Sequence, residues 1–147
     1  MQFRRSLIVV AFSLTVGLAA CGSQPAGGDA VIFGRWTPVT TDDCGPGGIV
    51  ITMRKSGVFG MTGGGLNEAV GKIVGHTQVD DDTIDLSYRQ IIRTMSGAKA
   101  LEDTPRALRF AVLNPDRIRA ISDSNDGRNF AALSSTMTEA FDLRRCE

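Results

Sequence analysis

A two-residue periodicity is the feature that most constrains the fold of this 147-residue chain. Between residues 48 and 122, apolar side chains repeatedly alternate with polar ones, and the breaks between these runs are rich in Gly, Asp, Asn, Ser and Pro. Such alternation is typical of strands that bury one face, because successive side chains along a strand point to opposite sides. The sequence therefore predicts short antiparallel strands joined by local turns.

Three runs show the alternation most clearly. The side chains that we expect to face inward are Ile49, Ile51 and Met53 in the first run, Ile84, Leu86 and Tyr88 in the second, and Leu108, Phe110 and Val112 in the third. Residues 54–57 are expected to turn the first run into a hairpin with residues 58–61. Asn114-Pro115-Asp116 is expected to turn the third run back into residues 117–122, because Pro presets its φ and the flanking Asn and Asp side chains bond nearby backbone.

Other segments are less regular. Residues 91–101 fit either a helix or a long loop at a barrel mouth, and residues 60–65 fit a flexible loop or a hairpin tip. Residues 128–133 follow a turn at 125–127. The closing run, residues 137–143, is expected to extend and to place Met137, Phe141 and Leu143 on one face.

These runs amount to about eight short strands, and we predict an all-β fold. Local turns favour an antiparallel meander, and closure into an up-and-down barrel would remove the exposed sheet edges that promote aggregation. An open two-sheet sandwich is the alternative. Residues 31–147 are expected to form one domain, since a chain of this length suits a single core.

The N-terminal 20 residues predict an export signal. Two arginines precede an uncharged, mainly apolar run, residues 7–20. The run has the length of a signal-peptide core but is shorter than the roughly 20 residues that a membrane-spanning helix needs. It ends in Leu18-Ala19-Ala20-Cys21, which resembles the lipobox of bacterial lipoprotein precursors. This resemblance implies that residues 1–20 are removed and that Cys21 carries the lipid; an ordinary secretory signal is the alternative.

Residues 21–30 contain no large apolar side chain and are expected to form a flexible, lipidated tether. Its r.m.s. span is about 15–18 Å, so the domain would lie close to the bilayer. The expected location is therefore the cell envelope. By analogy with lipoprotein sorting, Gly22 after the cysteine favours the outer membrane, facing the periplasm, in a bacterium with two membranes.

The charge of the mature chain argues against nucleic acid as a partner. Without residues 1–20 the chain retains 14 basic residues against 16 acidic ones, and the basic residues are scattered as singles and pairs. Sequence-independent binding of nucleic acid requires clustered Lys and Arg.

With Cys21 lipidated, Cys44 and Cys146 remain as a pair in an oxidising compartment, and we expect them to form a disulfide. In the chain-entropy model, closing a loop of about 100 residues contributes up to about 4.7 kcal/mol. Metal ligation is the rival interpretation, but no Cys-x-x-Cys or nearby His accompanies either cysteine.

The stretch Gly34-Arg35-Trp36 resembles the Gly-x-Trp motif in the first strand of lipocalins and related calycins. The resemblance implies that Trp36 plugs the closed end of a barrel beneath a basic residue from a late strand, which Arg144 or Arg145 would supply. A disulfide between the first-strand region and the C-terminus would also resemble this group. The META domain is an alternative, because it also has a Gly-x-Trp strand, although its characteristic sequence is missing at residues 62–67. A further alternative is that Trp36 is an ordinary core side chain.

No motif indicates catalysis, a metal or a cofactor. The single histidine, His76, is expected at a strand end or turn, and no Gly-x-Ser-x-Gly accompanies it. Asp80-Asp81-Asp82 is expected to be a solvated turn, because a Ca²⁺ loop needs spaced ligands. Arg117, Arg119 and Arg128 fit either a small basic patch or scattered surface charges.

The function that we expect is therefore a non-enzymatic binding module anchored in a membrane. Its ligand would be a small apolar molecule, with Trp36 and Tyr88 as the candidate contacts inside the barrel. The alternative is a protein-protein module, such as a hydrolase inhibitor or an accessory subunit of an envelope complex, which would present an exposed apolar patch.

Overall fold

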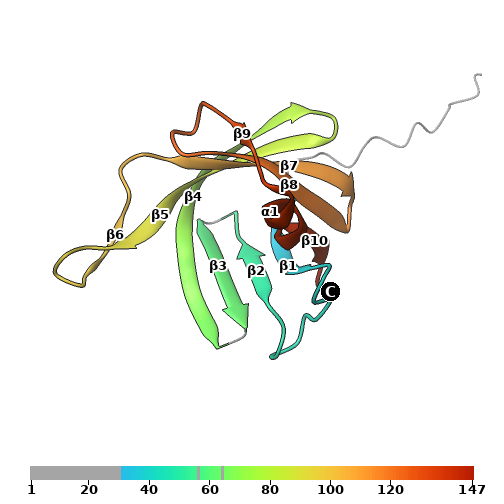
Figure 1. Ribbon diagram of the computed structural model, residues 1–147, viewed down its shortest axis with the longest axis horizontal. Coiled ribbons are helices and arrows are strands. Elements are labelled where there is room, and N and C mark those ends of the chain that lie inside the picture. Colours follow the sequence, from blue (N-terminus) through green and yellow to red (C-terminus); the bar gives the residue numbers. More distant parts are fainter. Residues whose placement is uncertain (1–30, 56, 64) are drawn as a thin grey trace, which may run out of the picture.

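Strands dominate the computed structural model, which describes residues 31–55, 57–63 and 65–147 (Figure 1). The elements of this part of the chain are β1 (Gly34–Pro38), β2 (Val50–Met53), β3 (Val58–Gly63), β4 (Leu66–Asp80), β5 (Thr83–Arg93), β6 (Lys99–Leu101), β7 (Arg106–Asn114), β8 (Arg117–Ser124), β9 (Ala131–Ala132), α1 (Ser135–Ala140) and β10 (Asp142–Arg145).

Eight of the strands form a closed antiparallel barrel. Their order is β10-β1-β2-β3-β4-β5-β7-β8, and β8 pairs in turn with β10, where Ile118 lies opposite Leu143. The two shortest strands lie outside this ring, because β6 pairs with β5 and β9 pairs with β8. The predicted closed meander is therefore confirmed, and the open sandwich is not formed.

The predicted hairpins are present, and the structure gives their register. Ile51 of β2 lies opposite Met61 of β3, and Phe110 of β7 lies opposite Ala120 of β8. The side chains predicted to face inward in these strands are largely buried, because the barrel interior excludes water. The core of the described residues consists of Ile32, Trp36, Ile51, Met53, Phe59, Ile73, Ile84, Leu86, Leu108, Phe110, Ile118, Ala120 and Leu143.

The sequence predicts a helix or a long loop at residues 91–101, and the structure has neither. These residues extend β5 and fold back as β6, with Ile91 opposite Leu101 and Arg93 opposite Lys99. The turn between them is hydrogen-bonded, because Thr94 N–H donates to the Ala98 carbonyl at 2.8 Å. We call residues 91–101 the arm, since this hairpin projects beyond the barrel wall in Figure 1.

The prediction of an extended closing run was wrong for residues 137–140, because they belong to α1 (Ser135–Ala140). The Ser134 side chain accepts a hydrogen bond from Met137 N–H and caps the first turn of the helix. A search for two-residue periodicity does not detect such a cap. Met137 is consequently exposed, whereas Leu143 is buried in β10 as expected. In residues 128–133 only Ala131–Ala132 forms a strand.

Two further expectations in the first half of the chain need correction. Residues 60–63 belong to β3 rather than to a flexible loop, so the hairpin tip begins only after Gly63. His76 lies within β4, opposite Leu86 of β5, rather than at a strand end or turn. The turn expected at the acidic residues 80–83 is present between β4 and β5.

The alternating strand directions define two ends of the barrel. The start of β1, the end of β10 and the turns after β2, β4 and β7 lie at one end, which we call the closed end. The connection between β1 and β2, the arm, and the segment from β8 through α1 to β10 lie at the other, the open end.

Candidate binding site at the open end of the barrel

Trp36 seals the closed end. Its side chain has no exposed surface, and its indole N–H donates to the Ile32 carbonyl at 3.0 Å. The Arg145 guanidinium lies 4.3 Å from the centre of the ring and donates to the Phe33 carbonyl at 3.0 Å. A guanidinium over an indole face is a favourable cation–π arrangement, so Arg145 holds the plug in place.

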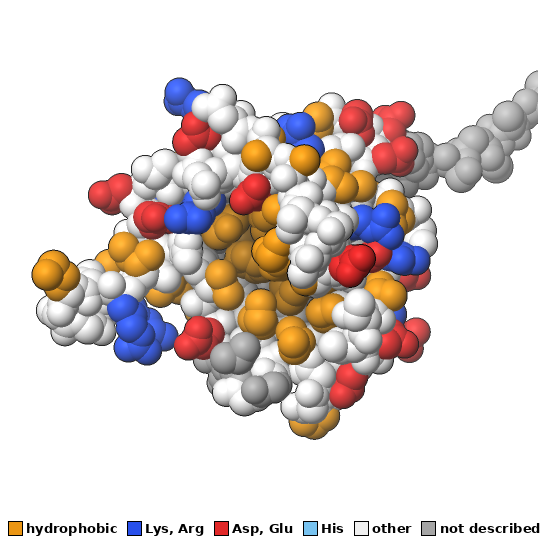
Figure 2. Space-filling model, in the orientation of Figure 1, with side chains coloured by type: hydrophobic (Ala, Val, Ile, Leu, Met, Phe, Trp, Pro, Cys, Tyr) orange, Lys and Arg blue, Asp and Glu red, His pale blue; other side chains and the backbone are white. Residues whose placement is uncertain are grey.

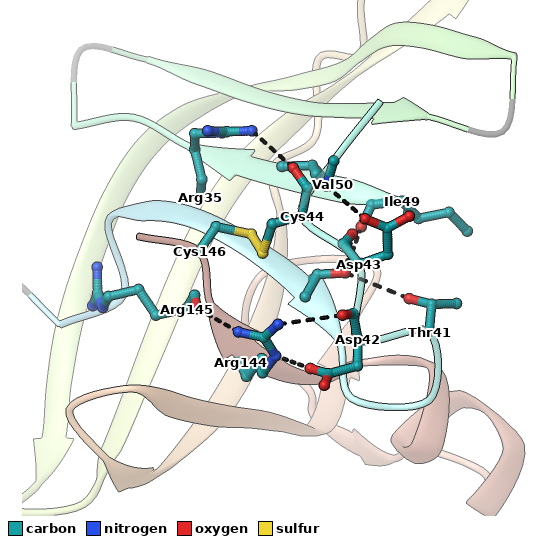
Figure 3. Close-up of a disulfide and its surroundings, with 12 residues drawn as sticks. Arg35, Thr41, Asp42, Asp43, Cys44, Ile49, Val50, Arg144, Arg145 and Cys146 are labelled. Atoms are coloured by element: carbon teal, nitrogen blue, oxygen red, sulfur yellow. Dashed lines mark hydrogen bonds and ion pairs between the residues drawn. A yellow bond between two sulfur atoms is a disulfide. The ribbon is translucent and has the colours of Figure 1, made fainter. Parts of the chain in front are cut away.

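Arg145 is thus the basic residue that the sequence analysis expected over Trp36, and Arg144 is not. Arg144 lies on the neighbouring position of β10 and bonds Asp42 in the connection between β1 and β2 (Figure 3). The alternation of side chains along β10 explains this difference, because adjacent residues of a strand face opposite sides. Trp36 itself presents no surface to a ligand unless the residues around it move.

The connection between β1 and β2 is fastened to the outside of the barrel (Figure 3). Cys44 and Cys146 form the expected disulfide, with their Cα atoms 5.7 Å apart. The buried Thr37 hydroxyl lies 2.9 Å from the carbonyl oxygens of Asp43 and Ile49. The connection is therefore held on both sides of Cys44, and Ile49 is fixed at the start of β2.

An apolar cavity lies at the open end. Its volume is about 230 Å³, and the wall is mostly hydrocarbon from three regions that are distant in sequence. The lining residues are Pro38, Thr40, Thr41, Ile49, Ile51, Met61, Ala140 and Phe141. Below the cavity, the interior is filled by the core side chains, as is usual for a barrel of about eight strands.

Figure 2 shows the surrounding surface as a hollow in which hydrophobic side chains gather, flanked by acidic and basic ones. Several half-buried apolar side chains that pack on the core belong to strands and connections at this end. They are Met61, Val70, Tyr88, Leu133 and Phe141. Half-buried apolar surface in a concave region is the usual setting of a small-molecule site.

Tyr88 contributes a polar group to this region. Its ring packs edge-on against Phe59, with the ring centres 5.2 Å apart, and the side chain is half-buried. Burial raises the pKa of the Tyr88 phenol above its usual value, and the positive charge of Arg106 partly opposes that rise. The phenol therefore stays protonated at neutral pH and can donate a hydrogen bond.

Arg106 lies opposite Tyr88 in the sheet and is held by two neighbours. Its guanidinium donates to both carboxylate oxygens of Glu102, at 2.8 and 3.2 Å, and to the side-chain oxygen of Asn125 at 3.1 Å. The hydrogen bond from Arg106 lowers the pKa of Glu102. The pair is thus charged but locally neutral, and it fixes the base of the arm beside Tyr88.

The other candidate groups lie elsewhere. The His76 ring packs edge-on against Phe33, with the ring centres 5.1 Å apart, near the closed end. Arg117 and Arg119 do not form the suggested basic patch, because both donate to the Asp142 carboxylate, each at 2.9 Å. Within residues 31–55, 57–63 and 65–147, no group of three His, Cys, Asp or Glu side chains is arranged to hold a metal ion.

The export signal, Cys21 and the tether, residues 1–30, lie outside the described residues. In the part of the chain that is described, no helix combines the length and the apolar character needed to cross a membrane.

Comparison of the chain with models of known protein families, with curated proteins and with solved structures found no match.

Proposed function

We propose that this protein is a non-enzymatic envelope lipoprotein, anchored by a lipid on Cys21, that binds a small apolar group at the open end of its barrel. The observation that carries the proposal is the apolar cavity lined by Ile49, Ile51, Met61 and Phe141. Burying apolar surface against such a wall stabilises the complex by about 25 cal/mol of free energy per Å².

The size of the cavity limits the ligand. Pockets for drug-sized molecules measure roughly 300–1,000 Å³, and the cavity here is about 230 Å³ above a filled interior. It suits one aromatic ring or the end of an acyl chain, with the remainder of the molecule in solvent. Tyr88, at the same end of the barrel, offers a hydroxyl to a polar group on such a ligand.

The position of Val31 supports an orientation for the anchored protein. Val31 is the first described residue, and its carbonyl accepts a hydrogen bond from Arg145 at the closed end. A tether attached at Val31 would therefore begin beside the Trp36 plug. The open end would then face away from the bilayer that holds the lipid, and in a bacterium with two membranes it would face the periplasm.

Ligand binding can be tested with N-phenyl-1-naphthylamine, an uncharged apolar dye whose fluorescence rises when it leaves water. We expect saturable binding to residues 22–147, the mature chain without its lipid-bearing Cys21, after export and purification without reductant. Met61→Glu places a charge in the cavity wall and should weaken binding by at least about tenfold. Val79→Glu changes an exposed apolar residue of β4 in the same way and should leave binding unchanged.

Equal binding by the wild type and the Met61→Glu variant would contradict the cavity as the site, and so would the absence of saturable binding. The anchor needs a separate test. Incorporation of labelled palmitate by the full-length chain in a bacterial host should be lost in Cys21→Ser, and its persistence in that variant would overturn the lipidation of Cys21.

A further inference from the structure

Four cations share one outer face of the sheet around the arm. Lys72 of β4 lies directly opposite Arg89 of β5, and Arg93 of β5 lies directly opposite Lys99 of β6. Arg89 and Arg93 are four positions apart on one strand, so their side chains point to the same side. All four residues are exposed. We call them the cationic face.

Within the described residues the cationic face has no carboxylate partner, in contrast to several other arginines of the barrel wall. Arg106, Arg109 and Arg117 are each bound by a carboxylate. None of the ion pairs formed within the described residues involves a member of the cationic face. Residues 86–101 also contain no Asp or Glu, although the mature chain has more acidic than basic residues.

This arrangement lowers the stability of the fold. Like charges directly opposite each other on neighbouring strands repel and weaken the pairing. A stable sheet normally avoids like charges on opposite positions of neighbouring strands, and this face has two such pairs. Departures of this kind are expected at functional positions. An anionic partner would remove the repulsion.

The same region contains unpaired strand edges. β4 begins at Leu66, but it pairs with β5 only from Gly71, which lies opposite Gln90. Beyond that point β5 pairs with β6 instead. One edge of residues 66–70 and one edge of residues 91–93 therefore have no neighbouring strand in the described structure. We call the space between these two edges the fork; in Figure 1 the arm and the lower part of β4 diverge around it.

A cavity of about 150 Å³ lies in the fork, lined by Glu68, Ala69, Ile91, Arg93 and Lys99. Glu68 is the single carboxylate among these residues, so the lining retains a positive charge. Met95, at the tip of the arm, is fully exposed. The fork thus combines free backbone groups, positive charge and nearby apolar surface.

We propose that the fork is a docking site for an extended acidic segment of a partner protein, which adds as a strand to a free edge while its carboxylates meet the cationic face. Unpaired edges are templates for such strand addition, in which main-chain hydrogen bonds supply affinity and side chains supply specificity. An anionic bilayer would satisfy the cations but would leave the free backbone edges without strand partners, so a peptide fits both features.

The probe for the test is a fluorescein-labelled peptide of about 12 residues that alternates glutamate and threonine, because a strand of this kind presents one acidic face. Fluorescence anisotropy at low salt should show saturable binding to oxidised residues 22–147. Arg93→Glu should weaken binding by about tenfold or more. Arg128→Glu, an equal change of charge at an exposed residue elsewhere, should alter binding by less than about twofold.

Two further peptides test strand addition itself. One is N-methylated at the glutamates and the other at the threonines, so each keeps the charge but loses the N–H groups along one edge. Strand addition predicts that at least one of them binds about tenfold more weakly. The Arg93→Glu chain serves as its own folding control, because relief of the repulsion with Lys99 should keep its urea midpoint at or above that of the wild type.

Several results would overturn the proposal. They are the absence of binding by the glutamate–threonine peptide, unchanged binding by both methylated peptides, and an equal loss in the Arg93→Glu and Arg128→Glu chains. Binding to vesicles that contain phosphatidylglycerol, lost in Arg93→Glu while the peptide fails to bind, would assign the cationic face to a lipid surface instead.

Discussion

At the scale of single residues, Tyr88 can be studied in isolation because the chain contains one tyrosine. Its phenol combines partial burial against Phe59 with the charges of Arg106, Asp123 and Glu102. Burial has the largest effect and favours the neutral form, whereas Arg106 favours the phenolate. The ionisation of Tyr88 therefore reports directly on the environment at the open end.

We predict that ultraviolet absorbance of the phenolate will give a midpoint above pH 10 in the folded chain and near pH 10 in urea. Arg106→Gln should raise the folded midpoint further, since it removes the opposing positive charge. Because the unfolded phenol ionises first, the free energy of unfolding should fall as the pH rises above about 10. A folded midpoint at or below the urea value would contradict the burial of Tyr88.

At the scale of elements, the seam between β8 and β10 decides whether the sheet closes. Asp142, at the start of β10, is nearly buried and accepts hydrogen bonds from Arg117 and Arg119 of β8. These hydrogen bonds lower the pKa of Asp142, so it is ionised at neutral pH. Charge-assisted bonds of this kind are stronger than neutral ones.

Asp142→Ala should therefore lower the free energy of unfolding by about 1.5–3 kcal/mol, because it leaves two arginines without an acceptor at the seam. Urea denaturation of the oxidised chain measures the change. Asp116→Ala is the matched control, because Asp116 is exposed and lies 3.7 Å from Arg145, and it should cost at most about 1 kcal/mol. Equal losses in the two variants would contradict a special role for Asp142.

Alternation in the sequence predicted those strands in which the residues between the buried ones are polar, such as the strands that contain Leu86 and Phe110. It missed β4 because the register shifts between Ile73 and Gly75, which interrupts the two-residue pattern. Gly71 adds to the difficulty, because its backbone approaches β5 so closely that a Cβ atom would lie 2.7 Å from the Arg89 carbonyl oxygen. Only the three-dimensional pairing reveals that contact.

The same distinction applies to the candidate sites. The alternation placed Tyr88 on the inner face, but the cavity also needs Thr41 and Phe141, which come from two connections that meet only in the folded chain. The acid-free run of residues 86–101 was visible in the sequence. The opposition of Lys72 to Arg89 was not, because it depends on the register of β4.

At the scale of the whole molecule, the disulfide joins positions 102 residues apart. A Cys44→Ser, Cys146→Ser double variant should lose up to about 4.7 kcal/mol of unfolding free energy, because its unfolded chain regains the freedom that the cross-link removes. The measurement is urea unfolding of the variant beside the wild type, each with and without dithiothreitol. Reductant should affect the wild type alone, and a loss below about 1 kcal/mol would show that the closed barrel does not rely on the bond.

The pairing of β10 with both β1 and β8 also sets the order of events during biogenesis. If the chain is exported as proposed, N-terminus first, the local hairpins β2–β3 and β7–β8 can form as they emerge. The barrel cannot close until residue 145 has emerged, because the strand that pairs with β1 lies more than 100 residues downstream. Contacts of such long sequence separation form slowly. Until then, β1 and β8 each keep an open edge, so the nascent protein would be most vulnerable to proteases and to aggregation just before translocation is complete.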